Sequence, residues 1–178
     1  MGRAPADDSV AVQPAMDEVA AVRSQLLADL ERWETELARY SLTRPTLWAG
    51  VYAKAFRSFE VLAGCAAAHW MAVAGQPGQR VAADVARGRS ADRLTVGQRL
   101  GILRRLDALG LVDKARWQTD LDLLDRLVKN RNDFAHGRFG YEDHDVATLR
   151  ALFTDLRALC HSPIIRFYAS SRDQLPDK

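Results

Sequence analysis

The chain has 178 residues, 48% of them hydrophobic and 27% charged, which is the composition of one globular domain with a core of its own. Its formal net charge of +2 is too small to indicate a nucleic-acid or membrane partner unless the charge is locally clustered. No apolar run is long enough to span a bilayer, and the first residues do not form a secretory signal, so we expect a cytoplasmic protein.

The first half of the chain predicts two long helices. Residues 1–14 are small and polar and contain proline, and we expect them to be disordered. From Ala15 to about Tyr40 apolar residues recur at steps of three and four, which predicts an amphipathic helix that ends before Pro45. Residues 47–74 are apolar around most of a helical circumference, so we expect the central helix there. Glu60 interrupts this run and should face at least partly inward.

A segment rich in Gly and Arg follows, over residues 75–93, and is expected to form a long loop. Between Arg80 and Arg105 the chain has seven Arg and two acidic residues. Such a cluster is either an ordinary solvated surface or a surface that follows a phosphate backbone. The candidate RNA contacts are Arg80, Arg87, Arg89 and Arg93, together with Arg138 further along the chain.

Three more helices are predicted, over about 95–109, 114–137 and 143–161. Ser162 and Pro163 should interrupt the last of them before a short helical piece that ends at Tyr168. No strand pattern or internal repeat is present. The predicted fold is therefore all-α, an up-and-down bundle of about five helices over residues 15–170, followed by a tail over 171–178.

Residues of the types that bind metals do not form a metal-binding pattern. Cys65 and Cys160 lie in apolar helical contexts, so we expect buried free thiols, with a disulfide between them as the alternative. Asp133 and His136 form one carboxylate–His pair at helical spacing, but a di-iron bundle needs a second such pair, which is missing. We therefore expect no metal and no other cofactor.

The predicted helix 114–137 carries a charged residue on its apolar face. At about 100° per residue, Arg131 falls in the middle of that face. A guanidinium keeps its charge when buried and needs a partner, and Glu60 of the central helix is the acid that we expect to pair with it. Asn132 and His136 are four residues apart, so they should be neighbours on the flank of the same face.

The segment Arg131-Asn132-Asp133-Phe134-Ala135-His136-Gly137 resembles the motif of the HEPN superfamily, which has an Arg, a polar residue, three variable positions and a His near the end of a bundle helix. The helix pattern over about 15–168 is similar as well. The resemblance implies a metal-independent endoribonuclease of a toxin–antitoxin or phage-defence system, often a homodimer with its two motifs facing each other. It also implies an antitoxin or another defence protein as a partner.

The sequence after the motif differs from that of one class of these toxins, and this excludes one type of antitoxin from the expected partners. Toxins that are silenced by nucleotide transfer carry a Tyr two residues after the His, and this chain has Arg138 at that position. Tyr141 lies too far along to take the same role by the motif. We therefore do not expect an antitoxin that transfers nucleotides.

The residue types in the motif suit RNA cleavage without a metal. An imidazole can take a proton from a ribose 2′-hydroxyl, or give one to the leaving oxygen, near neutral pH. We predict that Arg131, Asn132 and His136 are catalytic, with Glu60 in support, and that the products end in a 2′,3′-cyclic phosphate. The alternative is a non-catalytic helical module that binds RNA or a protein, in which Arg131 and Glu60 form only a structural ion pair.

Overall fold

The computed structural model describes residues 9–39, 45–75, 96–105, 117–138 and 146–166. Within these ranges every regular element is a helix and there is no strand, so the prediction of an all-α fold is confirmed. The helices are α1 (Ser9–Arg39), α2 (Pro45–Ala74), α4 (Val96–Leu103), α5 (Gln118–Ala135), α6 (Val146–His161) and α7 (Pro163–Arg166).

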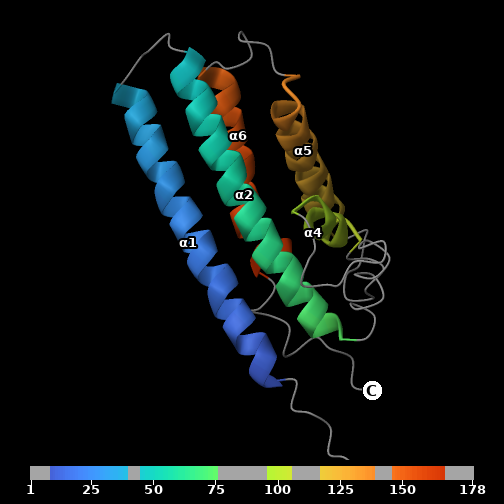
Figure 1. Cartoon of the computed structure of the whole chain (residues 1–178). Coiled ribbons are helices and arrows are strands. Elements are labelled where there is room, and N and C mark those ends of the chain that lie inside the picture. Colours follow the sequence, from blue (N-terminus) through green and yellow to red (C-terminus); the bar gives the residue numbers. More distant parts are fainter. Residues whose placement is uncertain (1–8, 40–44, 76–95, 106–116, 139–145, 167–178) are drawn as a thin grey trace, which may run out of the picture.

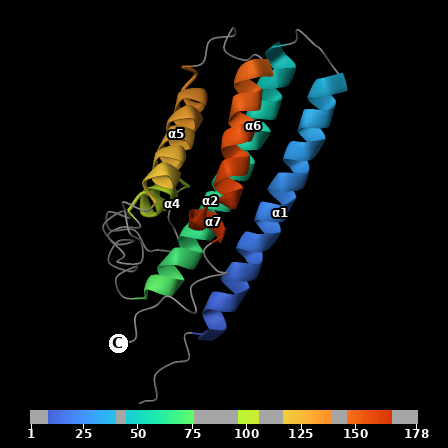
Figure 2. The same ribbon diagram turned by 180° about the vertical axis from the view of Figure 1, so that it is seen from behind.

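Four long helices form a bundle in which each runs antiparallel to the one before it (Figure 1). Helices α1 and α2 lie side by side, α6 packs against both, and α5 packs against α6 on the side away from α1 (Figure 2). The short helices α4 and α7 pack on α2, and α7 also packs on α6. The C-terminal end of α5 lies at the same end of the bundle as the N-terminal ends of α2 and α6 (Figure 1).

Helix α2 is the centre of the core, as its apolar circumference predicts. Its buried residues include Tyr52, Phe59, Leu62 and Trp70, none of them more than 1% exposed. Burying a side chain as large as Phe stabilises the fold by about 1.5–3 kcal/mol. The indole Nε1 of Trp70 also donates a 2.9 Å hydrogen bond to the carbonyl oxygen of Ile164, which ties α7 to α2.

Several helix ends differ from the predicted ends. Helix α1 begins at Ser9, so residues 9–14 are helical where the sequence predicted disorder. Helix α2 begins at Pro45, whose fixed φ and missing N–H suit a first helical turn. Helix α4 ends at Leu103, because the N–H of Arg105 bonds at 2.9 Å to the carbonyl oxygen three residues back, in a tighter turn. The predicted continuation of this helix is therefore wrong for residues 104–105.

Other predictions are confirmed or lie outside the described residues. The break at Ser162 and Pro163 is confirmed, since it separates α6 from α7. The other predicted loops and the tail over 171–178 lie outside the described residues. Among the described helices, none combines the length and the apolar character that a membrane span requires.

Both cysteines are free, so the alternative of a disulfide between them is wrong. Cys160 is buried and Cys65 is half-buried. Desolvation is the main cause that raises the pKa of each thiol to about 11. Both side chains are therefore protonated and weakly nucleophilic at neutral pH.

Candidate active site

Arg131 lies at the contact between α5 and α2, where its Nε donates a hydrogen bond to Oε1 of Glu60. The predicted pairing of these two residues is confirmed. The Arg131 side chain is 27% exposed and the Glu60 side chain 12%, so the ion pair is partly buried. The Arg131 Nη1 donates a second hydrogen bond, of 3.1 Å, to the amide oxygen of Asn132. Its Nη2 donates no hydrogen bond among the described residues, so it has the capacity to donate one to an anion.

A second guanidinium, which the sequence analysis missed, reaches the same carboxylate. Arg57 precedes Glu60 by three positions on α2, and its Nη1 lies 3.6 Å from Oε2 of Glu60. The Arg57 side chain is 72% exposed. Two guanidinium groups and one carboxylate leave this cluster with an excess of one positive charge, which favours an anion beside it. The spacing of three residues was the sequence signal for this contact.

Phe134 fixes the last turn of α5 against α2. Its ring centroid lies 6.0 Å from that of Tyr52 and 5.4 Å from that of Phe56. Aromatic pairs at such distances stabilise a fold by about 0.5–1.5 kcal/mol each beyond the burial of their area. A variable position of the motif therefore has a structural task, because it determines where the backbone of Arg131 and Asn132 lies.

His136 is the C-cap residue of α5, and its side chain is exposed. The N–H of Gly137 donates to the carbonyl oxygen of Phe134 at 3.1 Å, and the N–H of Arg138 donates to that of Asp133 at 2.8 Å. With Gly137 at a φ of +63°, these bonds form a Schellman ending. The backbone of His136 is thus held firmly, while its imidazole has no hydrogen bond or ion pair within the described part of the chain.

Arg131 and His136 leave α5 in different directions. Five helical steps separate them, which turns their side chains about 140° apart. The amide oxygen of Asn132 accepts its hydrogen bond from Arg131, so Asn132 orients the guanidinium. Its predicted contact with the imidazole is not among the hydrogen bonds of the described residues. The motif therefore presents two chemical groups at one helix end, on separate sides of the helix.

Asp133 balances the charge of two neighbouring cations. Its carboxylate accepts a 3.2 Å hydrogen bond from Nζ of Lys129 and another of 3.2 Å from Nη1 of Arg138. The hydrogen bond from Lys129 is the largest cause that lowers the pKa of Asp133. Arg138, a candidate RNA contact, is therefore partly neutralised. Over the described ranges no three His, Cys, Asp or Glu side chains are grouped as a metal site would need.

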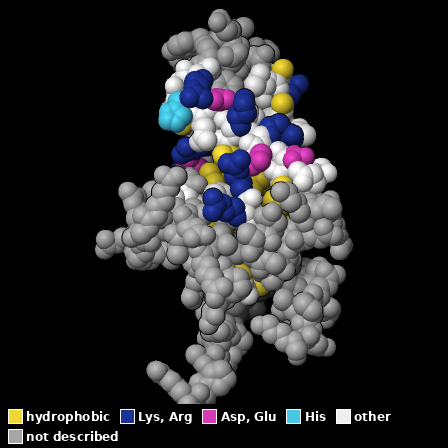
Figure 3. All heavy atoms as spheres, turned by 90° about the vertical axis from the view of Figure 1, so that its right-hand side faces the viewer, with side chains coloured by type: hydrophobic (Ala, Val, Ile, Leu, Met, Phe, Trp, Pro, Cys, Tyr) yellow, Lys and Arg dark blue, Asp and Glu magenta, His cyan; other side chains and the backbone are white. Residues whose placement is uncertain are grey.

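The surface over α5 carries both signs of charge. Figure 3 shows this side of the molecule, where Lys and Arg side chains gather with Asp and Glu between them. From Gln118 to Arg138 there are four acidic and four basic residues, so this segment is neutral overall. A strongly basic RNA surface would have to come from other segments. The candidates Arg80, Arg87, Arg89 and Arg93 lie outside the described residues, and their role stays a prediction.

No family model, curated protein or solved structure matches the chain. The resemblance to the HEPN superfamily is therefore carried by the motif and the helix pattern of this sequence alone. The all-helical fold is compatible with it, but such folds occur in many unrelated proteins. A functional assignment has to be argued from the residues at the end of α5.

Proposed function

We propose that this chain is a metal-independent endoribonuclease of the HEPN type that acts in a toxin–antitoxin or phage-defence context. The observation that carries the proposal is the partly buried Arg131–Glu60 pair. It holds a permanent positive charge, with one nitrogen free among the described residues, near a helix end that exposes His136. A fixed cation and an exposed imidazole are the two groups that phosphate transesterification can use, once they meet at one phosphate.

In this proposal Arg131 binds the scissile phosphate through Nη2, while Glu60 accepts from Nε and fixes the plane of the guanidinium. His136 takes the proton of the ribose 2′-hydroxyl. The 2′-oxygen then forms a bond to phosphorus as the bond from phosphorus to the 5′-oxygen breaks, and the 5′-oxygen takes up a proton from water. The products are a 2′,3′-cyclic phosphate and a 5′-hydroxyl. Arg57 adds a second positive charge near the phosphate as its negative charge rises.

The proposed site includes a second copy of the chain. The imidazole and the guanidinium of one copy point about 140° apart, so they do not converge on one phosphate from a single helix. A two-fold contact between α5 ends would bring His136 of one copy to the phosphate held by Arg131 of the other.

The test is incubation of the purified chain with mixed single-stranded RNA in excess EDTA. Cleavage with 2′,3′-cyclic phosphate ends is expected, and His136→Ala should reduce its rate by about 10²-fold or more. The circular dichroism of the variant should not change, because this side chain is exposed. His161→Ala, which replaces another exposed His at the end of α6, should cleave like the wild type. Cleavage that requires Mg²⁺, or that persists in His136→Ala, would refute the mechanism.

A non-catalytic module that binds RNA or a protein, such as an antitoxin or another defence protein, is the second candidate. Two observations favour it. The imidazole has no orienting partner within the described residues, and the acids and bases between Gln118 and Arg138 balance each other. Under this reading wild-type protein and His136→Ala would bind RNA equally well, and neither would cleave it.

A further inference from the structure

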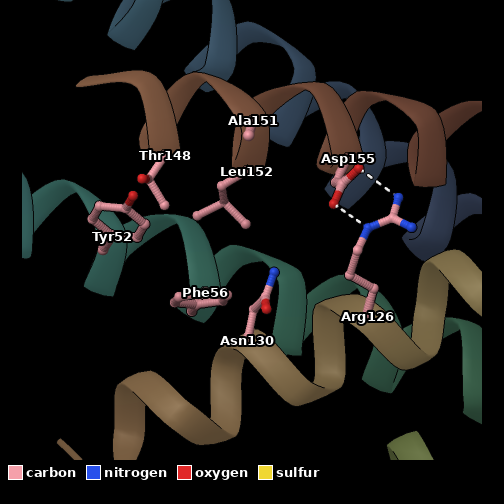
Figure 4. A pocket seen from close by; sticks show the side chains of 8 residues that line it. All are labelled: Tyr52, Phe56, Arg126, Asn130, Thr148, Ala151, Leu152 and Asp155. Atoms are coloured by element: carbon pink, nitrogen blue, oxygen red, sulfur yellow. Dashed lines mark hydrogen bonds and ion pairs between the residues drawn. The ribbon is translucent and has the colours of Figure 1, made fainter. Parts of the chain in front are cut away.

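A pocket of about 320 Å³ lies between α2, α5 and α6 (Figure 4). Tyr52 and Phe56 of α2 form its floor, Ala151 and Leu152 of α6 line one wall, and Asn130 of α5 lies on the opposite side. Ligand sites in proteins begin at about 300 Å³ and are mostly apolar with a few polar groups. The size and the lining of this pocket fit that description, and no step of the proposed cleavage uses it.

An ion pair closes one end of the pocket. Nε and Nη2 of Arg126 donate to the two carboxylate oxygens of Asp155 at 2.8 and 2.7 Å. This bidentate ion pair joins α5 to α6 and fixes their spacing beside the pocket (Figure 4). The pocket is therefore formed before any ligand arrives, and the charge of Arg126 is already balanced by Asp155.

Asn130 is the polar residue that α5 adds to the lining outside the ion pair, while α2 and α6 add the hydroxyl groups of Tyr52 and Thr148. The Asn130 side chain points from α5 into the space below α6 (Figure 4), and its amide has no hydrogen bond among the described residues. A primary amide presents a donor and an acceptor side by side. An aliphatic ligand would leave both without a partner, which costs free energy in a half-buried position. An anion would find no free cation in the described lining.

A nucleobase can pack against the apolar walls of the pocket and also hydrogen-bond to the amide of Asn130. Its flat faces suit aromatic and aliphatic contacts, and its edge carries the donor and acceptor groups that an Asn amide reads in pairs. We infer that this pocket takes one nucleobase, with Asn130 reading its edge. The inference rests on the proposed function only for the source of that base, which is single-stranded RNA. Asn130 directly precedes Arg131 on α5, with its side chain about 100° around the helix, so the pocket would select a base from the same strand whose phosphate Arg131 binds.

The test measures binding of labelled oligo-A, oligo-C and oligo-U of about ten nucleotides, in the His136→Ala chain to prevent cleavage. One base should bind at least about tenfold more tightly than the weakest, and Asn130→Ala should reduce that ratio to about twofold or less. Ala151→Leu, which places a larger side chain in the pocket, should weaken binding of the preferred RNA by about tenfold. Ala158→Leu makes the same change at an exposed position of α6 outside the pocket lining, and should bind like its parent.

Mononucleotides of the same three bases distinguish the two sources of a base. If the mononucleotide binds as tightly as the RNA, the pocket serves a free nucleotide; much tighter binding of the RNA assigns it to the RNA strand. Equal binding of all three RNAs, or no binding of any RNA or nucleotide, would overturn the inference. So would unchanged base selectivity in both pocket variants.

The experiments can reject the inference about the pocket and the proposal of a ribonuclease separately. Base-selective binding that is lost in Asn130→Ala, in a wild-type chain that cleaves nothing, keeps the pocket and rejects the enzyme. Cleavage whose sequence preference is the same in the wild type and in Asn130→Ala keeps the enzyme and rejects the pocket. Thermal unfolding of each variant by circular dichroism checks that the fold persists, which is expected because Asn130 makes no hydrogen bond that its loss could break within the described chain.

Discussion

Glu60 is the residue through which α2 acts on the motif. Glu60→Gln keeps its size but removes the charge that two guanidinium groups contact. Because the pair with Arg131 is partly buried, we expect the free energy of unfolding to fall by about 1–2 kcal/mol, between the usual values for surface and buried pairs. RNA cleavage should fall as well, since Arg131 loses the group that fixes its orientation. Urea unfolding and a cleavage assay on the same protein measure the two effects.

Glu34→Gln is the matched control for that change. Glu34 receives two hydrogen bonds from Arg157, one of them 2.7 Å long, in an ion pair between α1 and α6. Its loss should lower stability by at most about 1 kcal/mol, because both side chains are about a third exposed, and leave cleavage unchanged. If Glu60→Gln likewise lowered stability but left cleavage unchanged, Glu60 would be a structural residue without a role in the site.

Gly137 ends α5 in a conformation that other residues rarely adopt. Its φ is +63°, and a Cβ added there would meet no atom within 4 Å, so only backbone strain opposes a larger residue. Gly137→Ala should lower the free energy of unfolding by about 1 kcal/mol. Gly50 lies within α2, and a Cβ added there would also meet no atom within 4 Å. Gly50→Ala should raise the free energy of unfolding by about 0.5–1 kcal/mol, because Ala has a higher helix propensity than Gly. Urea unfolding that gave both changes the same sign would contradict this account of the α5 ending.

Part of the candidate site could be predicted from the sequence. Arg131 and Glu60 each interrupted an apolar helical face, so burial required that they find a partner, and they find each other. Arg57 was missed because an exposed Arg interrupts no pattern. The place of His136 at the C-cap could not be predicted either, since it depends on the dihedral angles at the end of the helix. Apolar periodicity determines which face of a helix is buried, but it carries no information about caps.

At the scale of elements, the long amphipathic helices were predictable and their ends were not. Helix α5 keeps its apolar residues on one face, and Leu121, Leu124 and Leu127 are buried as that pattern requires. The ends of α1 and α4 were misplaced because a helix end is decided by a few local hydrogen bonds, such as the one at Arg105. The pocket was not predictable, since it arises where three helices leave a space between their side chains.

Helix α2 contains a buried imidazole that should make stability depend on pH. His69 is 3% exposed, and desolvation lowers its pKa below the ordinary value of 6.5. As the pH falls below about 6.5 the unfolded chain binds a proton at His69 while the folded chain stays neutral, so the free energy of unfolding should fall until the pH passes the folded pKa. Urea unfolding at pH 7.5 and about 5.5 measures this dependence.

His69→Gln is the variant that isolates this effect. It removes the titrating group and leaves the other three His in place, so the difference in stability between the two pH values should be smaller than in the wild type. An identical pH dependence in the two proteins would show that His69 does not cause it. The absolute stability of the variant is not the readout, because a substitution at a buried position changes it at every pH.

At the scale of the whole molecule, the sequence predicted the helical bundle but carries little information on assembly. Among the side chains of residues 18–39, 49–75, 98–105, 117–138 and 146–166, Val61 is the one large hydrophobic side chain that is exposed, at 40%. These side chains therefore form no extended apolar patch of the kind that obligate dimers bury. A contact between two α5 ends would be mostly polar. Its strength should then fall with rising salt concentration, because the charged residues around His136 are exposed.

We predict a homodimer with Arg131, Asn132 and His136 at or beside its two-fold contact. Mixing His136→Ala with Arg131→Gln protein tests whether two copies share each site. Random exchange makes half of the dimers mixed, and each mixed dimer has one site with both groups intact, so about a quarter of wild-type cleavage should return. Each variant alone should stay inactive. No recovery in proven mixed dimers would place both groups of a site in one copy. Light scattering that shows only monomers at micromolar concentration would remove the basis for a shared site, and would favour the non-catalytic module.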